Sequence, residues 1–474
     1  MKNIITKLFG AALVVSSLYS CDDRLEEIQP EDALPIGTLF NDFPRISGTA
    51  AGMYSVLQDS DTNGVPQIIA DYTADNANFV GSFPTLQDIR DFSALSTNTN
   101  VSAIWQDAFQ NIRAANNILT NLPPLTSEDI DGTISELEDF DAFLKDQWIA
   151  EARFVRAISH FDLVNLFAQP FQVGNGSSAG IPIVTEFFAG NIEEFRKERA
   201  SVNDVHTFIE NELLLAIPDL PDTNPGRATA AAANALLARL YLYRENWENA
   251  ATFANNAISA PGVALATDYS FFNASSSEHI FQVRNLSDDA AVGNGYDVFY
   301  NPSSNNGRGD LPFAQDLIDA YSEETGDLRF SSLTISATDA GNNAGAIFTT
   351  KYPNGPTQDS DPNVLRVTEM YLIRAEANLI NGSTIGDTPL NDINALRERA
   401  GLDALTSVTL DEILTERRKE LAFEGHRRMD LLRNNQNLRS DGGAVSAPGA
   451  NKVILPIPQV ELDNNPSMVQ NDGY

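Results

Sequence analysis

The strongest hydrophobic pattern in the chain lies between Leu365 and Arg433, where three segments carry apolar residues at helical spacing. The first segment, LRVTEMYLIRAEANLING, has apolar rows on two sides, as expected of a helix packed between neighbours. A second helix is predicted over 391–399, closed by Gly401, and a third, charged helix is closed by Gly425. Three helices joined by short turns favour a helical-repeat or bundle wall over a cluster of catalytic loops.

Earlier segments repeat the same helical period, and proline ends several of them. The predicted helices are 47–57, the segment SAIWQDAFQNIRAANNILTNL, 146–167, 201–217 with Ser201 as its N-cap, and a helix pair within 227–258. The helix pair places small residues where a tetratricopeptide repeat brings two helices into close contact. These residues are Ala250, Ala254 and Ala257.

Two long insertions interrupt the helical pattern, at residues 59–100 and 260–364. The first is rich in Asp, Asn, Ser and Thr, and the second contains two short predicted strands, HIFQVRN and AIFTTKY, and one helix at 313–321. We therefore predict a mostly α fold, in which degenerate tetratricopeptide-type helix pairs form a scaffold and the loop-rich insertions form a second layer. Residues 41–474 are expected to form one domain.

The first residues of the chain have the pattern of a secretion leader. Lys2 and Lys7 precede a short apolar run, and Leu18–Cys21 is similar to a lipobox, so residues 1–20 are predicted to be a lipoprotein signal peptide. Cys21 would then carry the lipid, and residues 21–40, which are acidic and aperiodic, would form a flexible tether. The alternative is an ordinary secretory leader with an incidental cysteine. A lipid anchor is expected to be the only membrane attachment, because no other apolar run has the length of a membrane helix.

The composition excludes several classes of function. The formal charge is −34, which repels nucleic-acid phosphates and disfavours a nucleic-acid partner. The single cysteine excludes an internal disulfide framework and any zinc site built from several cysteines. With 42% apolar residues over 474 positions, the chain can bury a large core.

Three stretches of the closing region resemble the SusD/RagB family: RVTEMYLIRAEA, NALRERAGL and ERRKELAFEGHRRMDLLR. The resemblance implies a non-enzymatic lipoprotein of the outer membrane, facing the cell exterior. It also implies that the protein captures glycans for a SusC-like TonB-dependent transporter. The acidic residues that follow Cys21 resemble the tract that directs some lipoproteins of this family to the cell surface.

The sequence carries no nucleotide-binding or metalloprotease motif. The four histidines are scattered over different predicted elements, and no P-loop or HExxH pattern occurs. A glycoside hydrolase remains the alternative from another class, because 65 acidic residues supply carboxylate pairs in any fold. A peptide-capture member of the same family and a helical-repeat adaptor that binds only protein are further alternatives.

One short motif is similar to the start of a calcium-binding loop. Asp59, Asp61 and Asn63 offer oxygen ligands at alternate positions, followed by Gly64. The glutamate expected at the end of such a loop is replaced by Ala70. We therefore expect no cofactor and favour a turn without a metal, with calcium as the weaker alternative.

Sugar recognition needs flat aromatic faces and side chains that pair hydroxyl groups. Two loops supply both, and they fall where SusD-like proteins place ligand-binding loops. The three tryptophans, in contrast, lie in predicted helices and are interpreted as core residues. The predicted ligand residues are Tyr72, Asp75, Asn76, Asn78 and Phe79 in the first loop, and Tyr296, Phe299, Tyr300, Asn305 and Arg308 in the second.

The charged block Glu416–Arg433 is interpreted as structural. Glu424 and Arg428 are spaced for an ion pair, and Glu416, Arg417 and Glu420 can pair along one helix. Charges at this spacing usually form ion pairs that stabilise helices. We therefore expect a structural network of ion pairs that holds the last helices together, rather than a ligand site.

Overall fold

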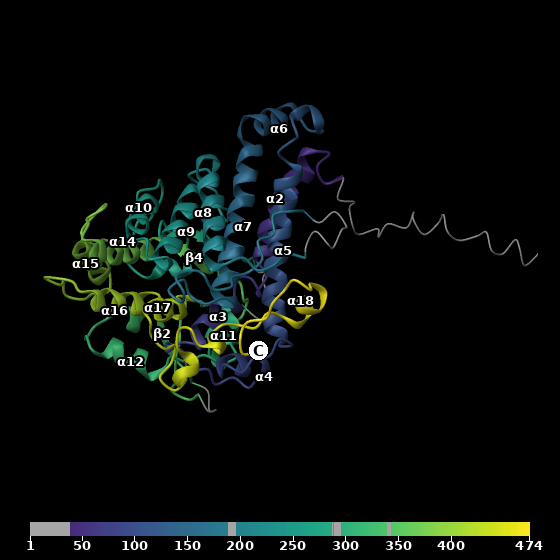
Figure 1. Ribbon diagram of the computed structural model, residues 1–474. Coiled ribbons are helices and arrows are strands. Elements are labelled where there is room, and N and C mark those ends of the chain that lie inside the picture. The colour runs from purple at the N-terminus through teal and green to yellow at the C-terminus, as the bar shows by residue number, and fades with distance from the viewer. Residues whose placement is uncertain (1–37, 188–195, 287, 289–294, 339–342) are drawn as a thin grey trace, which may run out of the picture.

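Long helices standing side by side form the main wall of the protein. The computed structural model describes residues 38–187, 196–286, 288, 295–338 and 343–474. Each helix of the wall contacts the next in chain order, so the prediction of a mostly α scaffold is confirmed (Figure 1). The wall consists of α2 (Phe43–Leu57), α5 (Thr99–Asn121), α7 (Lys145–Phe167), α8 (Val202–Ala216), α9 (Ala230–Tyr243), α10 (Trp247–Ile258) and α14 (Val367–Asn381).

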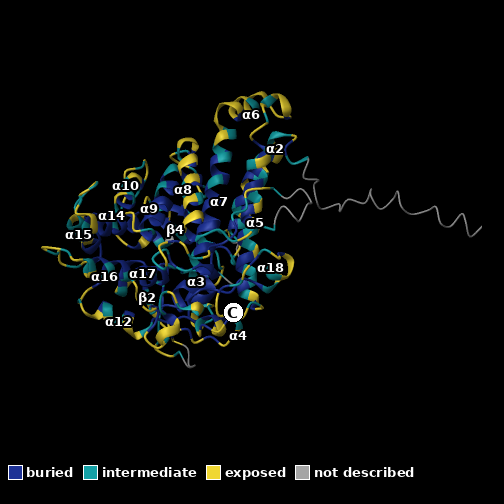
Figure 2. Cartoon of the chain, in the orientation of Figure 1, coloured by how far each residue is buried: buried dark blue, intermediate teal, exposed yellow. Residues whose placement is uncertain are grey.

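Shorter elements lie against one end and one side of this wall (Figure 1). α6 (Ile134–Asp139) forms an exposed tip instead (Figure 2). The elements near the lower end are α3 (Val65–Tyr72), α4 (Pro84–Arg90), α11 (Tyr296–Tyr300), α12 (Gln315–Ser322) and α13 (Leu328–Ser332). The closing elements are α15 (Pro389–Arg399), α16 (Leu410–Glu420), α17 (Arg427–Arg433) and α18 (Gln459–Asn464).

The α9–α10 pair shows how the sequence builds the wall. Ala250, Ala254 and Ala257 are fully buried, as the repeat pattern predicts, and they allow the two helices to approach closely. The predicted cap is also present, because the Ser201 hydroxyl accepts a hydrogen bond from the Asp204 amide at 3.1 Å at the start of α8. Local sequence signals therefore account for the placement of these helices.

Only short strands occur in the described part of the chain. β1 (His279–Gln282) pairs antiparallel with β4 (Asn363–Arg366), with Phe281 opposite Leu365. β2 (Thr334–Ser336) pairs with β3 (Ile347–Thr349), so both predicted strand segments do contain strands. The first pair holds α14 at its N-terminal end, because β4 leads directly into that helix.

The polar stretch 59–100 is more ordered than a polar composition suggests. It contains α3 and α4, and α3 buries Val65, Ile68 and Ile69 in the main core. Helix formation there was missed because the apolar residues of α3 span only two turns between polar neighbours. This short helix places the first predicted ligand loop.

The third closing helix ends earlier than its pattern predicts. α16 stops at Glu420, and Phe423 and Gly425 follow with positive φ angles of 65° and 79°. A Cβ atom on Gly425 would lie 2.8 Å from the Cβ of Gln67 on α3, so glycine is required by conformation and by space. The turn after α16 thus packs directly on α3.

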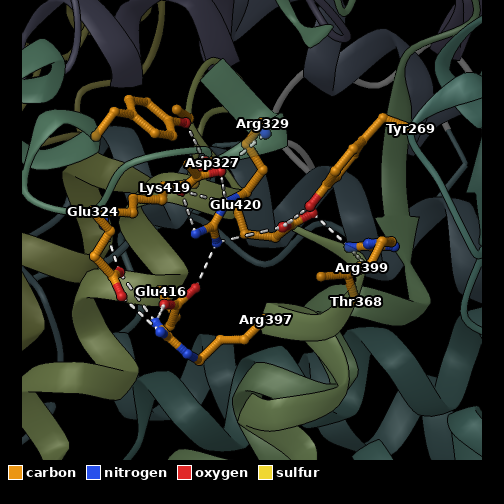
Figure 3. A network of polar contacts seen from close by, with 12 residues as sticks. Tyr269, Glu324, Asp327, Arg329, Thr368, Arg397, Arg399, Glu416, Lys419 and Glu420 are labelled. Carbon is orange, nitrogen blue, oxygen red and sulfur yellow. Dashed lines mark hydrogen bonds and ion pairs between the residues drawn. The ribbon is translucent and has the colours of Figure 1, made fainter. Parts of the chain in front are cut away.

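A network of buried charges joins the closing helices to the inserted layer. Arg366 contacts Glu278 at 3.1 Å, Glu420 at 3.2 Å and Glu424 at 2.7 Å. Figure 3 shows its continuation, in which Arg329 contacts Glu416 at 2.5 Å. All of these side chains are almost fully buried, which confirms the prediction of a structural network.

The predicted pairings within that network were wrong. Glu424 contacts Lys351 at 2.6 Å as well as Arg366, whereas Arg428 donates to the Val453 carbonyl oxygen at 2.5 Å. Glu416 and Glu420 of α16 likewise contact arginines from other elements, because those elements cover this face of the helix. Burial alone would raise the pKa of Glu420, but Arg399, Arg366 and Arg329 lower it to about 2.

Two predictions concern the membrane. Within the residues that the structure describes, no helix has the length and apolarity needed to cross a bilayer. The lipobox at Cys21, the signal peptide and residues 21–37 of the tether lie outside the described residues.

Candidate functional site

The two predicted ligand loops lie side by side. The amide of Asn78 donates to the Pro312 carbonyl oxygen at 2.9 Å, and the amide of Val80 donates to the Asp310 carbonyl oxygen at 2.9 Å. Ala77 and Phe313 form an antiparallel bridge beside these bonds. Backbone pairing thus joins segments that are more than 200 residues apart into one surface.

Most aromatic rings of the two loops point inward. Tyr296 and Tyr300 both stack on Tyr352, with ring centroids 4.6 Å and 5.3 Å away. Tyr72 packs against Phe79 with centroids 5.0 Å apart. These four loop residues are buried and form the base beneath the surface.

A buried hydrogen bond links this base to the closing region. The Tyr300 hydroxyl donates to Asp71 Oδ2 at 2.5 Å, and the Gly425 amide donates to the same oxygen at 3.2 Å. Burial raises the pKa of Asp71 to about 7, and it also raises the pKa of Tyr300 well above its usual value. The turn after α16 and α11 are therefore held to the end of α3 by one carboxyl group.

Asp75 and Asn76 anchor the first loop to the closing helices. Arg427 donates to both carboxylate oxygens of Asp75, at 2.6 Å and 2.8 Å. Arg418 donates to Asn76 Oδ1 at 2.8 Å and lies 3.4 Å from the Asp75 carboxylate. Both residues are thus occupied by protein partners, and this fixes the loop.

The outer surface of the paired loops contains an aromatic ring stacked on a guanidinium group. The Arg308 guanidinium lies 4.0 Å from the ring centroid of Phe83 and 4.5 Å from that of Phe299. Asp310 balances its charge at 2.8 Å. Phe299 is buried, whereas Phe83 is 53% exposed. Phe83 is therefore held in place while much of its surface faces solvent.

Two further amide side chains of the paired loops are accessible to solvent. Asn78 is exposed, and Asn305 is half-buried and donates to Asn301 Oδ1 at 2.7 Å. We call six exposed or half-buried residues of the paired loops the loop face. It consists of Asn78, Val80, Phe83, Asn305, Asn306 and Arg308.

The structure thus separates the ten predicted ligand residues into two groups. Tyr72, Asn76, Phe79, Tyr296, Phe299 and Tyr300 are buried, and the remaining four are exposed or half-buried. Phe83 was missed among the predicted residues because it stands at the end of its loop, before Pro84. A phenylalanine directly before a helix-starting proline was the available signal, because a residue before proline is held in an extended conformation outside the helix, as Phe83 is.

A separate hollow of about 640 Å³ lies outside the two loops. Its lining includes Ser178, Arg199, Asn451 and Gln470. The Arg199 guanidinium donates to the backbone oxygens of Gly180, Ala179 and Val469, so it is committed to holding segments of the chain together. This hollow was not predicted from the sequence.

The weak calcium candidate is arranged differently from its motif. Asn63 is buried, and its Oδ1 lies 3.4 Å from the Tyr296 hydroxyl. Asp59 and Asp61 instead lie close to Asp107 of α5. Two of the three motif residues thus lie beside α5, and the third contacts α11.

Two family models match most of the chain. The model described as "SusD family" matches residues 322–474, and the model described as "Starch-binding associating with outer membrane" matches residues 29–242. The chain belongs to the SusD/RagB family, which confirms the resemblance seen in its closing region.

Individual relatives agree with this assignment. The chain is 24% identical to a SusD-like protein of Bacteroides ovatus over 478 residues, covering 90% of this chain and 82% of the relative. It is similar to a solved SusD superfamily protein of Bacteroides vulgatus, with a TM-score of 0.79, 25% identity and coverage of 92% and 100%. A solved "Laminarin binding SusD-like protein" has a TM-score of 0.75, 25% identity and the same coverage.

Proposed function

We propose that this protein captures oligosaccharides at the outer face of the outer membrane and delivers them to a SusC-like TonB-dependent transporter. The family assignment supports carbohydrate binding at the cell surface, since one matching model is described as starch-binding and outer-membrane-associated. The transporter and the lipid anchor at Cys21 are part of the proposal because they fit the family. Catalysis forms no part of this role.

The exposed Phe83 ring is the observation that carries the proposal. A sugar ring presents C–H groups that pack on an aromatic face, and its hydroxyl groups pair with amides and guanidinium groups. Phe83 supplies the aromatic surface, Arg308 lies against it, and Asn78 and Asn305 are further polar groups of the loop face. Because Arg308 and the paired loops already fix this arrangement, ligand binding costs little conformational entropy.

With Phe83 as the aromatic contact, Tyr296 and Tyr300 take a supporting role instead of the ligand contact that the sequence predicts. Tyr296 and Tyr300 are buried and stacked, so they offer no face to a ligand in this conformation. We propose that they support the loop face from beneath. Replacing either by Ala would weaken binding only through loss of this support, together with loss of stability.

Isothermal titration of the mature protein against starch-, laminarin- and other glycan-derived oligosaccharides tests the proposal. Phe83→Ala is expected to weaken binding about tenfold or more, the loss expected for one aromatic contact. Phe143→Ala is the matched control, because Phe143 is 50% exposed but lies outside both loops. An equal loss in both variants would contradict the role of Phe83.

The same samples separate the alternative functions. Product release from a polysaccharide by the purified protein would indicate a hydrolase, and binding of peptides without binding of any glycan would indicate peptide capture. We expect neither result.

A further inference from the structure

A cluster of three carboxylates joins the turn after α2 to helix α5. One oxygen each from Asp59, Asp61 and Asp107 lies within 4.8 Å of the others. Asp59 is exposed, whereas Asp61 and Asp107 are half-buried. The cluster therefore brings three like charges together at the edge of the core.

No described Lys or Arg forms an ion pair with these carboxylates. Their recorded partners are neutral donors: the Asp61 amide donates to Asp59 Oδ1 at 2.9 Å, and the Gln110 amide group donates to Asp107 Oδ1 at 2.8 Å. The pKa of Asp61 is raised to about 6, mainly by burial and to a smaller extent by the negative charges of Asp59 and Asp107. The repulsion between these groups has no counter-charge among the described side chains.

Asn111 provides an independent indication of a ligand site. It lies one turn after Asp107 on α5, is fully buried, and neither its Oδ1 nor its Nδ2 has a hydrogen-bond partner. A buried amide without partners is energetically unfavourable. Asn111 and Asp61 line the same small cavity of about 10 Å³. Such a volume accepts about one water or ion.

We propose that Asp59, Asp61 and Asp107 bind one calcium ion beside Asn111. The available donors are all oxygens, which hard cations prefer. Oxygen ligands of Ca²⁺ lie at about 2.3–2.6 Å from the ion, so ligands on opposite sides are up to about 5 Å apart, in keeping with the cluster. The exposed side at Asp59 leaves room for water ligands.

This site differs from the calcium loop suggested by the sequence motif. The motif drew all of its ligands from consecutive positions and included Asn63, which is turned toward Tyr296. Here the third carboxylate comes from α5, so the ion would link two separate elements. The turn at 58–64 leads into α3, and α3 ends at Asp71 and Tyr72, which lie beneath the loop face. Calcium would therefore stabilise the support of that face.

Calorimetric titration of the full mature protein with calcium chloride, after removal of metals with EDTA, tests the site. We expect one ion per chain, and a rise in Tm of about 2–4 °C at saturating calcium. Asp107→Asn should weaken calcium binding about tenfold or more. Asp319→Asn is the matched control, because Asp319 is exposed on α12 and likewise accepts a hydrogen bond from a glutamine, Gln315.

A second variant shows whether a loss of calcium binding reflects the loss of a ligand or a folding defect. Asp59→Asn changes an exposed side chain and should also weaken calcium binding, while magnesium should bind the wild type more weakly than calcium. Without calcium, Asp107→Asn should unfold at a higher temperature than the wild type, because one repelling charge is removed. Absence of binding to the wild type at millimolar calcium, or unchanged binding in Asp59→Asn and Asp107→Asn, would overturn the proposal.

Discussion

The network of buried charges around Arg366, which we call the closing network, uses the same kinds of side chain as the loop face, but for a different purpose. In the network, Arg366 contacts three glutamates and is almost fully buried. In the loop face, Arg308 has one carboxylate partner and lies between two phenylalanine rings, one of them exposed. The comparison teaches that solvent access, rather than residue type, separates structural groups from candidate ligand groups in this protein.

The largest expected effect lies in the closing network. Arg366→Ala should lower the free energy of unfolding by about 3–5 kcal/mol, because it leaves buried glutamates without their partner. Arg284→Ala is the matched control: the Arg284 side chain is 50% exposed and contacts Asp361 at 3.0 Å. Its loss should cost at most about 1 kcal/mol. Similar values for both variants in urea unfolding would show that burial does not distinguish the two regions.

The next effect concerns the carboxyl group that joins the two regions. Burial raises the pKa of Asp71 in the folded protein to about 7, above the usual value of 3.8. The folded state therefore holds this proton more tightly, and the contribution of Asp71 to stability is lost as pH rises between about 4 and 7. Relative to the wild type, Asp71→Asn should gain about 4 kcal/mol of stability across that range.

Unfolding curves at several pH values measure this difference. The variant Asp88→Asn, at an exposed position on α4, provides the reference. A constant difference between Asp71→Asn and the wild type across the range would contradict the predicted protonation of Asp71.

The smallest effect is expected for Arg308. Arg308→Ala removes the planar group between Phe83 and Phe299, so oligosaccharide affinity should fall about fivefold, equivalent to about 1 kcal/mol. Arg308→Lys keeps the charge but not the planar stack, and should recover only part of the loss. Full recovery in calorimetric titrations would show that charge alone matters at this position.

The sequence predicted the scaffold better than the site. Small residues at Ala250, Ala254 and Ala257 and the cap at Ser201 are local signals, and the structure confirms both. The closing region also carried enough of the family pattern to be assigned correctly.

Side-chain direction and distant pairing were harder to predict. Tyr300 stands in an aromatic loop typical of a binding surface, yet it points at Asp71, more than 200 residues earlier. Glu424 similarly contacts Lys351 and Arg366 instead of Arg428, its neighbour on the predicted helix. Periodicity describes only the local face of an element, and these contacts depend on which other elements cover that face.

Hydrogen–deuterium exchange with and without a bound oligosaccharide tests the central claim most directly. If the loop face holds the ligand, protection should appear in residues 78–83 and 303–309 and be absent from the exchanging amides of α15 and α16. Protection confined to the segments that line the separate hollow, 178–180, 449–454 and 467–472, would contradict this account and place the ligand there.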